Sequence, residues 1–350
     1  MSSRAWTSDK AAMQPRLTSG ISIEGDALFD RVPNWEKRLL ASPAGRTYQV
    51  IVRLCCLAFL GYFRHRVASL PNGLIWEKLG ERFLFRRRYI EIAETSFGAK
   101  IICNTKDLIQ RYIMAFGVWE PDLTAFIKRR LSKGDVFIDL GANIGYFSLL
   151  ASQIVGKEGK VIAIEAAPQI FEALLQNLSL NQIGNVRPAL TAVAAESGLV
   201  SLYSGGSDNL GASTIIAANA RGPIVAKVSC DRFESIVKPE ELARARMVKI
   251  DLEGAEVPPL RALIKFAPNL RRDLEIVVEL CPARLRVAGS SINEILTGFN
   301  EQGFSAYQLR NTYTPGPYID RYPVLPPKRI RSQITEQADL VFSRVDAEEL

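Results

Sequence analysis

The chain has 350 residues, of which 47% are hydrophobic and 23% are charged, with a formal net charge of +7 at pH 7. This composition is typical of a globular protein with a sizeable core and excludes a fibrous or disordered chain. The five cysteines show neither C-x-x-C nor metal-ligand spacing, which favours reduced thiols and a cytoplasmic location. No signal peptide is predicted, because the first thirty residues are polar and lack an apolar segment.

The N-terminal region is predicted to contain two segments. Residues 1–45 are polar and punctuated by prolines, which predicts a flexible N-terminus. Residues 46–94 are predicted to form a helical extension. Within it, the apolar part of residues 50–66 is too short to span a bilayer, which takes about 20 apolar residues. A buried or interface helix is favoured there, and peripheral membrane contact is the alternative.

Residues 95–345 are predicted to form one α/β domain. Its predicted elements alternate between strands and helices as far as residue 193: strand 101–103, helices 107–116 and 121–131, strand 136–140, a helix from about 144, strand 160–165, helix 168–180 and strand 186–193. Further strands are predicted at 247–251, 275–280, 304–309 and 339–342.

Two segments exceed what a minimal fold needs. Short strand signals at 200–203 and 224–228 flank a loop of small residues, which predicts an inserted hairpin. That hairpin either approaches the active site or decorates the surface. Residues 311–327 contain five prolines and three tyrosines, and such a connection is typical of a lid or a substrate wall.

The stretch VFIDLGANIGYF, residues 136–147, is the most informative of the chain. It predicts a buried strand that ends near Asp139, a glycine turn and the start of a helix. The strand at 160–165 also ends in an acid, Glu165. Because parallel strands place their carboxyl ends at one edge of a sheet, the two acids predict half of a nucleotide-binding fold.

The glycine spacing determines which nucleotide is predicted. A dinucleotide site needs G-x-G-x-x-G, whereas this chain has Asp139-x-Gly141-x-x-x-Gly145, and no Gly-Lys-Ser/Thr of a P-loop follows. An acid before the turn would repel a pyrophosphate but suits a ligand with an amino group and a sulfonium. The sequence therefore predicts a site for S-adenosylmethionine. The alternative is that Asp139 and Glu165 only cap turns.

Four segments together resemble the FkbM-type S-adenosylmethionine-dependent methyltransferases: GVWEP at 117–121, GDVFIDLGANIGYFS at 134–148, GASTI at 211–215 and KIDLEGAE at 249–256. The resemblance covers about residues 95–285. It implies a Rossmann-like class I methyltransferase fold, with a seven-stranded, mostly parallel sheet and helices on both faces. One departure is Glu165-Ala166-Ala167-Pro168, where the family usually has Glu-Pro-x-Pro, so the loop beside the adenosine differs.

The cofactor site follows from these motifs. The glycines are expected to shape the methionine pocket, with Asp139 taking the amino group and Asn143 the carboxylate. Glu165 can accept both ribose hydroxyls, because a carboxylate has two oxygens. Ala192 and Val193 are expected beside the adenine, and the resemblance places Glu120 near the cofactor. The predicted cofactor-binding residues are Glu120, Asp139, Gly141, Ala142, Asn143, Gly145, Glu165, Ala192 and Val193.

The catalytic base is predicted to be a carboxylate. A hydroxyl acceptor must lose its proton as it attacks, and histidine, the usual base, occurs only at His65 between two arginines. Asp251 at the end of a strand, with Glu253 beside it, is therefore predicted to be catalytic. The alternative is that both organise the turn. Two such carboxylates would also suit Mg²⁺, although metal dependence is not expected.

The predicted function is methyl transfer from S-adenosylmethionine to a small-molecule or glycan acceptor, by O-methylation of a sugar or secondary-metabolite hydroxyl. The alternative is a methyltransferase-like scaffold without turnover. Basic clusters at 82–88, 128–130 and 328–331 fit either a solvated surface or an anionic acceptor. Nucleic acid is not expected, because no zinc-finger, basic-zipper or RNP-like pattern accompanies them. The sequence leaves O- against N-methylation and the oligomeric state open.

Overall fold

The computed structural model describes residues 43–65, 72–81, 85, 89–206, 211–311 and 313–350. The chain separates into two units, residues 1–51 and 52–350. In the first unit the described residues belong to helix α2 (Pro43–His65), which continues into the second. The predicted flexible segment 1–45 lies outside the described residues as far as residue 42, and Pro43 already begins the helix.

The part of α2 in the second unit buries one face only. The buried residues recur at helical spacing and pack against Trp76 and Phe85; they are Cys56, Phe59, Leu60 and Phe63. On the opposite face Leu54 and Leu57 stay 59% and 37% exposed. Across the described ranges, no helix combines the length and the apolar character that crossing a membrane requires.

The rest of the extension is only partly helical. Helix α3 (Asn72–Ile75) and the π-helical turn η2 (Trp76–Glu81) follow α2. Residues 90–94, predicted as the end of a helix, instead form strand β1 (Ile90–Glu94), which pairs antiparallel with β2 (Lys100–Asn104). The prediction was wrong because the alternation in IEIAE has the period of a strand, and every second residue of β1 is exposed.

The second unit is built on a sheet with eight strands in the described residues, in the order β12-β11-β13-β10-β9-β3-β4-β5. The strands are β3 (Val136–Leu140), β4 (Lys160–Glu165), β5 (Val186–Leu190), β9 (Ala245–Ile250), β10 (Glu275–Leu280), β11 (Ser305–Leu309), β12 (Lys328–Arg329) and β13 (Ala338–Ser343). The pairs among β5, β4, β3, β9 and β10 are parallel, and β13 is antiparallel to β10 and β11. The predicted Rossmann-like α/β class is confirmed.

The predicted strand count of seven is one too low. The additional strand, β12, contains two residues and pairs with β11 at the edge of the sheet. A strand so short has no detectable period in sequence. The predicted strand 186–193 is also divided at Thr191 into β5 and β6 (Ala192–Val193), and β6 leaves the main sheet to pair with β8 (Ile224–Asp231).

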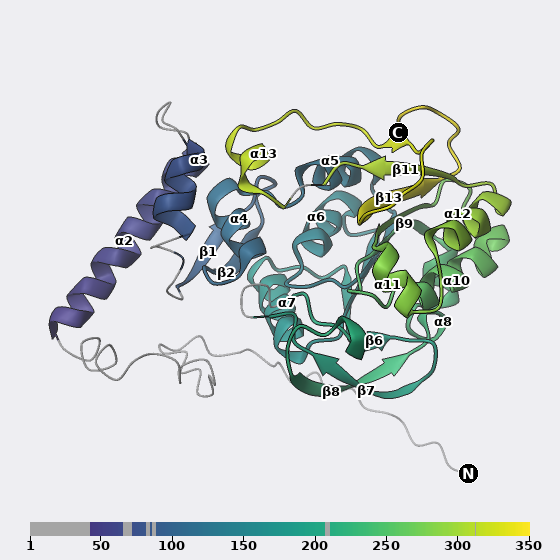
Figure 1. Ribbon diagram of the computed structural model, residues 1–350, viewed down its shortest axis with the longest axis horizontal. Coiled ribbons are helices and arrows are strands. Elements are labelled where there is room, and N and C mark those ends of the chain that lie inside the picture. Colours follow the sequence, from purple (N-terminus) through teal and green to yellow (C-terminus); the bar gives the residue numbers. More distant parts are fainter. Residues whose placement is uncertain (1–42, 66–71, 82–84, 86–88, 207–210, 312) are drawn as a thin grey trace, which may run out of the picture. The chain divides into compact units, whose positions relative to one another are not determined.

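Helices cover both faces of the sheet, and two hydrophobic clusters fill the layers. One cluster joins the sheet to helices α4 (Leu108–Phe116), α5 (Pro121–Arg130), α6 (Tyr146–Val155) and α7 (Pro168–Leu180). The other joins it to α8 (Phe233–Ile236), α10 (Val257–Phe266) and α12 (Ile292–Glu301). Figure 1 shows α5 and α6 apart from α10 and α12, with the strands between. Burial on both faces explains why the strands are continuous apolar runs.

Alternation along the strands decides which side chains reach the site. Phe137, Met247 and Val277 belong to the cluster with α4–α7, so the residues two positions further on face the same way. These are polar in every case and lie toward one edge of the sheet: Asp139 on β3, Lys249 on β9 and Glu279 on β10. Helix α5 begins on the same side, after Glu120.

Candidate active site

The turn after β3 requires glycine for two different contacts. Gly141 and Gly145 have φ of +80° and +92°, a region that other residues rarely adopt. A Cβ on Gly141 would lie 1.9 Å from the carbonyl oxygen of Asp251, and one on Gly145 would lie 2.5 Å from Cδ1 of Leu174. The turn therefore lies directly against the end of β9 on one side and against α7 on the other.

Glu165, the last residue of β4, is held by the same turn. The backbone N–H of Asn143 donates to its Oε2 at 2.9 Å, and the N–H of Ala167 donates to its Oε1 at 2.8 Å. Each oxygen can accept one further hydrogen bond, so the carboxylate can bind two vicinal hydroxyl groups. Burial raises the pKa of Glu165 to about 7, although these backbone bonds oppose the shift. The loop at Ala166 and Ala167 differs from the family's usual Glu-Pro-x-Pro, yet it still supplies a hydrogen-bond donor to Glu165.

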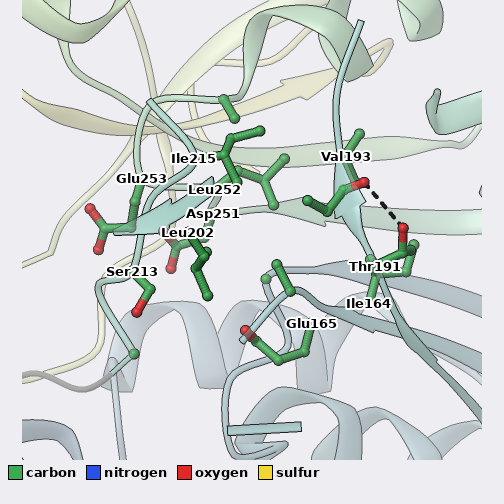
Figure 2. Close-up of a pocket in the computed structure, with 15 residues that line it drawn as sticks. Ile164, Glu165, Thr191, Val193, Leu202, Ser213, Ile215, Asp251, Leu252 and Glu253 are labelled. Carbon is green, nitrogen blue, oxygen red and sulfur yellow. Dashed lines mark hydrogen bonds between the residues drawn. The ribbon is translucent and has the colours of Figure 1, made fainter. Parts of the chain in front are cut away.

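A pocket opens beside this carboxylate. Figure 2 shows Asp251, Glu253 and Ser213 toward one side of it, Thr191 and Val193 toward the other, and Glu165 between them. Of the predicted site residues, the lining includes Gly141, Glu165, Ala192, Val193, Asp251 and Glu253. The lining does not include Glu120, Asp139, Ala142, Asn143 or Gly145. Sequence reasoning missed Thr191, which no motif marks, and gave no role to Ser213, although it lies in the GASTI segment at 211–215.

The inserted hairpin takes part in this pocket. Its strands are β7 (Gly198–Tyr203) and β8 (Ile224–Asp231), and the connecting loop contributes Ser213 and Ile215 to the lining. Thr214 Oγ1 donates to the carbonyl oxygen of Glu253 at 2.8 Å. A Cβ on Gly211 would lie 2.0 Å from Nδ2 of Asn143. The hairpin loop thus lies against Glu253 and against Asn143 of the glycine turn, so it is more than a surface decoration.

Asp139 lies beneath the turn, fully buried, and its two oxygens have different surroundings. Ser148 Oγ donates to Oδ2 at 2.6 Å, whereas Oδ1 has no hydrogen-bond partner within the described ranges. Lys249 Nζ lies 3.8 Å from this Oδ1 and 3.5 Å from Oδ2 of Asp251. Burial raises the pKa of Asp139, and Lys249 and Ser148 oppose that shift.

Lys249 is a site residue to which the sequence reasoning gave no role. Burial alone would lower its pKa, but the carboxylates of Asp251, Asp139 and Glu120 outweigh burial and raise it. The buried side chain is therefore an ammonium ion between the acid of the glycine turn and the acid at the end of β9. A lysine inside an apolar strand was the available signal, because buried lysines are rare without partners.

Glu120 does not line the pocket but lies close to Lys249 and Asp251. Its backbone has φ of +43°, and its N–H donates to Oη of Tyr318 at 3.0 Å. Burial raises the pKa of Glu120 to about 7; Lys249 opposes the shift, and Asp251 adds to it. Glu120 thus belongs with the charged groups around Lys249 and Asp251.

Further polar groups lie near Asp251. Tyr313 Oη donates to Oε1 of Glu279 at 2.8 Å, and Arg284 lies 2.8 Å from Oε2 of Glu253 and 3.5 Å from Oε2 of Glu279. Burial raises the pKa of Glu253 to about 7, with the nearby Asp251 acting in the same direction and Arg284 opposing it. Sequence reasoning gave no role to Glu279 or Arg284, whereas Tyr313 belongs to the segment 311–327 that was predicted to be a lid or a substrate wall.

The turn after β9 is organised by a different acid. Oε1 of Glu256 accepts the N–H groups of Leu252 at 3.1 Å and Gly254 at 2.9 Å. The carboxylates of Asp251 and Glu253 point elsewhere, toward Lys249 and Arg284. Glu256 therefore explains the shape of the turn, and no contribution from the side chains of Asp251 and Glu253 is needed.

Backbone strain is concentrated at the predicted residues. Five non-glycine residues in the described part of the chain have positive φ, and Glu120, Asn143 and Glu253 are three of them. Such conformations cost about 1–3 kcal/mol each and persist only where the surroundings impose them. The three strained positions therefore lie at the same end of the sheet as the pocket and the buried charged groups.

The structure describes the three basic clusters only in part. Residues 82–84 and 86–88 lie outside the described residues. Arg130 pairs with Glu275, and the C-terminal cluster is paired within the chain, through Lys328–Glu349, Arg329–Asp346 and Arg331–Glu348. Among the side chains that the structure describes, no three of His, Cys, Asp and Glu are grouped to hold a metal ion.

Comparisons with known proteins bear on this site. Residues 139–306 match the family described as methyltransferase FkbM domain. A probable cobalt-precorrin-6B C(15)-methyltransferase of Sulfolobus acidocaldarius is 40% identical over 67 residues, which are 19% of this chain and 35% of that protein. A protein-L-isoaspartate O-methyltransferase 2 of Archaeoglobus fulgidus is 38% identical over 56 residues, 15% and 26% of the two chains.

This chain thus spans about a third or less of the length of these curated relatives, at 35% and 26%. Among solved structures, a SAM-dependent O-methyltransferase of Thermotoga maritima is similar, with a TM-score of 0.36 and 17% identity, over 74% of this chain and 79% of that one. The family match begins at Asp139 and includes the glycine turn, Glu165 and Asp251. Residues 139–306 of this chain are therefore similar to the methyltransferase FkbM domain.

Proposed function

We propose that this protein transfers a methyl group from S-adenosylmethionine to a hydroxyl of a sugar, glycan or secondary metabolite. The observation that carries the proposal is one arrangement at the carboxyl edge of the sheet. There Glu165, Gly141 and the exposed side chain of Asp251 line one pocket, and Gly141 packs tightly against the Asp251 carbonyl.

The residues present fit the nucleoside. Glu165 keeps two acceptor positions for the ribose hydroxyls, and Ala192 and Val193 provide an apolar wall for the adenine. The Oδ1 of Asp139 is a buried acceptor without a hydrogen-bond partner among the described residues, and we assign it to the amino group, directly or through water. When bound, S-adenosylmethionine supplies a methyl group activated by its positive sulfur.

Asp251 is the base in this proposal. Its side chain is 41% exposed, while its neighbour Lys249 is 7% exposed, so the carboxylate faces the cleft with a fixed positive charge behind it. As the acceptor oxygen bonds to the methyl carbon and the carbon–sulfur bond breaks, Asp251 accepts the hydroxyl proton. The rest of the site contributes by holding the reacting groups in line.

The surroundings of Asp251 favour a neutral, hydroxyl-rich acceptor. Tyr313 is 40% exposed and stacks on Trp119, with ring centroids 5.8 Å apart, while its hydroxyl is held by Glu279. An aromatic ring beside carboxylate acceptors matches the apolar face and hydroxyl edge of a sugar. The acids Glu120 and Glu279 would repel an anionic acceptor, so the anionic alternative is not favoured.

Transfer of radiolabelled methyl groups from S-adenosylmethionine to a panel of neutral sugars tests this function. We expect methyl ethers on one class of sugar, and a loss of turnover by about 10²–10⁴ in Asp251→Asn, because the base is removed. Cofactor affinity in that variant should stay within a few-fold of the wild type. Glu253→Gln, with its carboxylate paired to Arg284, is the matched control and should lose less activity. Cofactor binding with no methylated product from any sugar would instead support a scaffold without turnover.

A further inference from the structure

A second pocket lies at the same end of the sheet, beyond the polar residues around Asp251. It is formed at the ends of β11 and β13, and the chain around residues 325–328 closes it from outside. Its polar lining includes Gln308, Asn311, Lys328, Gln337 and Asp339. None of these residues lines the Glu165 pocket, so the two are separate.

Two residues connect this second pocket to the groups around Asp251. Asn311 Nδ2 donates to Oη of Tyr313 at 3.0 Å, and Gln337 Nε2 donates to Oε1 of Glu279 at 2.5 Å. The side chain of Asn311 also lowers the pKa values of Glu120 and Asp339, which places it close to both. Asn311 and Gln337 therefore link the second pocket to the polar residues around Asp251.

The polar residues between Asp251 and Asn311 form a strip across the ends of the strands, and the strand order gives its length. From β9, which is followed directly by Asp251, the sheet continues through β10 and β13 to β11, and Asn311 lies two residues beyond the end of β11. Neighbouring strands lie about 4.8 Å apart, so the three steps span about 14 Å. A single sugar ring at Asp251 would leave the far end of the strip vacant, whereas a chain of two or more rings would reach it.

The lining suits neutral hydroxyl groups rather than a charged ligand. Amide side chains both donate and accept hydrogen bonds, and Gln308 is exposed with no side-chain hydrogen bond among the described residues. Burial and the nearby Glu120 raise the pKa of Asp339 well above its usual range, which favours a neutral carboxyl that can donate. Arg310, which also lines the pocket, is committed to Asp122 at 2.7 Å and adds no free charge.

We propose that the pocket at Gln308, Asn311 and Asp339 is a second sugar subsite, so that the acceptor is a disaccharide or longer glycan methylated on the unit at Asp251. This inference rests on the proposed sugar O-methylation and adds to it the size of the acceptor. The aliphatic residues Leu325 and Pro326 provide the apolar surface on which the second ring would lie.

The test compares acceptors that differ only in length. Methyl glycosides of glucose, galactose, mannose, rhamnose and fucose are compared with disaccharides of the same sugars, by saturation-transfer NMR for binding and by methyl incorporation for turnover. We expect the accepted disaccharide to exceed its monosaccharide at least about tenfold in affinity and in kcat/KM, because the second ring adds contacts worth about 1.4 kcal/mol. A ratio near one for every sugar would overturn the inference while leaving the proposed function intact.

Substitution in the pocket gives an independent readout. Gln308→Trp should fill the subsite and bring the disaccharide-to-monosaccharide ratio close to one. Gln153→Trp, at an exposed glutamine in the last turn of α6 that lines neither pocket, is the matched control and should leave the ratio unchanged. A ratio that survives Gln308→Trp would place the second ring elsewhere and overturn the inference. If no sugar of either length binds or accepts methyl groups, the proposed function fails together with the subsite.

Discussion

The ammonium group of Lys249 lies 3.5 Å from Oδ2 of Asp251, at the point where a buried strand meets the cleft. Lys249 is almost fully buried, whereas Asp251 is substantially exposed, so the pair connects the interior of the sheet to the surface on which an acceptor would bind. The same ammonium also neutralises Asp139 beneath the glycine turn. One lysine therefore serves both the predicted cofactor acid and the predicted base.

Removing this lysine should destabilise the fold. Lys249→Met leaves the carboxylate of Asp139 buried without its counter-charge, and breaking such a pair typically costs about 3–5 kcal/mol. Chemical denaturation measures the free energy of unfolding. The double variant Asp139→Asn/Lys249→Met should recover much of the loss, because the uncompensated charge is gone. Additive losses in the double variant would mean that the two side chains do not interact.

Glu256 should make stability depend on pH. Burial raises its pKa to about 7 from an ordinary value of 4.5, against the opposing bonds from Gly254 and Leu252. The stabilisation from this group is therefore complete below about pH 4.5 and is lost as the pH rises through about 7. Glu256→Gln keeps an acceptor without the charge, so its free energy of unfolding relative to wild type should rise with pH across this window, by up to about 1.4 kcal/mol per unit.

Glu241 provides a control of opposite sign. Although burial would raise its pKa, Arg187 and Lys160 lower it to about 2. Its stabilisation is complete above about pH 4.5 and is lost only as the pH falls through about 2. The cost of Glu241→Gln should therefore be constant between pH 5 and 8. A Glu256→Gln difference that is equally flat would contradict a raised pKa for Glu256.

The hairpin loop should control affinity for the nucleoside. A Cβ on Gly205 would lie 2.2 Å from the carbonyl oxygen of Ala212, so Gly205→Ala must displace the backbone that carries Ser213 and Ile215 to the pocket. We expect affinity for S-adenosylhomocysteine to fall about tenfold in a fluorescence titration, a change of about 1.4 kcal/mol. Gly184→Ala, where the added carbon meets open space, should leave affinity unchanged. Equal affinities in the two variants would show that the loop does not cover the ligand.

The exposed face of α2 makes the membrane interpretation testable. Pro43–His65 contains no acidic residue, and Leu54 and Leu57 are exposed on it. If the helix lies on a membrane surface, sedimentation with phosphatidylserine vesicles should carry down less Leu54→Ser/Leu57→Ser than wild type. Leu175→Ser/Leu199→Ser replaces two other exposed leucines and is the matched control. Identical sedimentation of all three proteins would remove the membrane contact.

The sequence predicted elements well where one physical signal was unopposed. Strands β3, β4 and β10 and helix α7 have the predicted bounds, because each is an apolar or periodic run with clear stops. Prediction failed where the signal was short or ambiguous. The alternation in β1 covers only five residues, and β12 only two. The division at Thr191 depends on pairing with β8, which is distant in sequence.

The same limit applies to the site. Glu165 and Asp251 could be predicted because strand ends carry ligands in this class of fold, and both line the pocket. Asn311 and Asp339 could not, because they reach the site only through the antiparallel return of β13 and the segment packed over it. Lys249 lay inside a quoted motif, yet its role depends on the neighbouring strand that carries Asp139.

The central claim, that the Glu165 pocket holds S-adenosylmethionine, is tested most directly by calorimetric titration. Wild type and Glu165→Gln are titrated with S-adenosylmethionine, S-adenosylhomocysteine and NAD, and thermal melts confirm that both are folded. We predict micromolar binding of the two sulfur ligands, no binding of NAD, and an affinity about 10–100-fold lower in Glu165→Gln, because a charge-assisted hydrogen bond is worth about 1.5–3 kcal/mol. Absence of binding by either sulfur ligand, or equal affinity in the variant, would contradict the account.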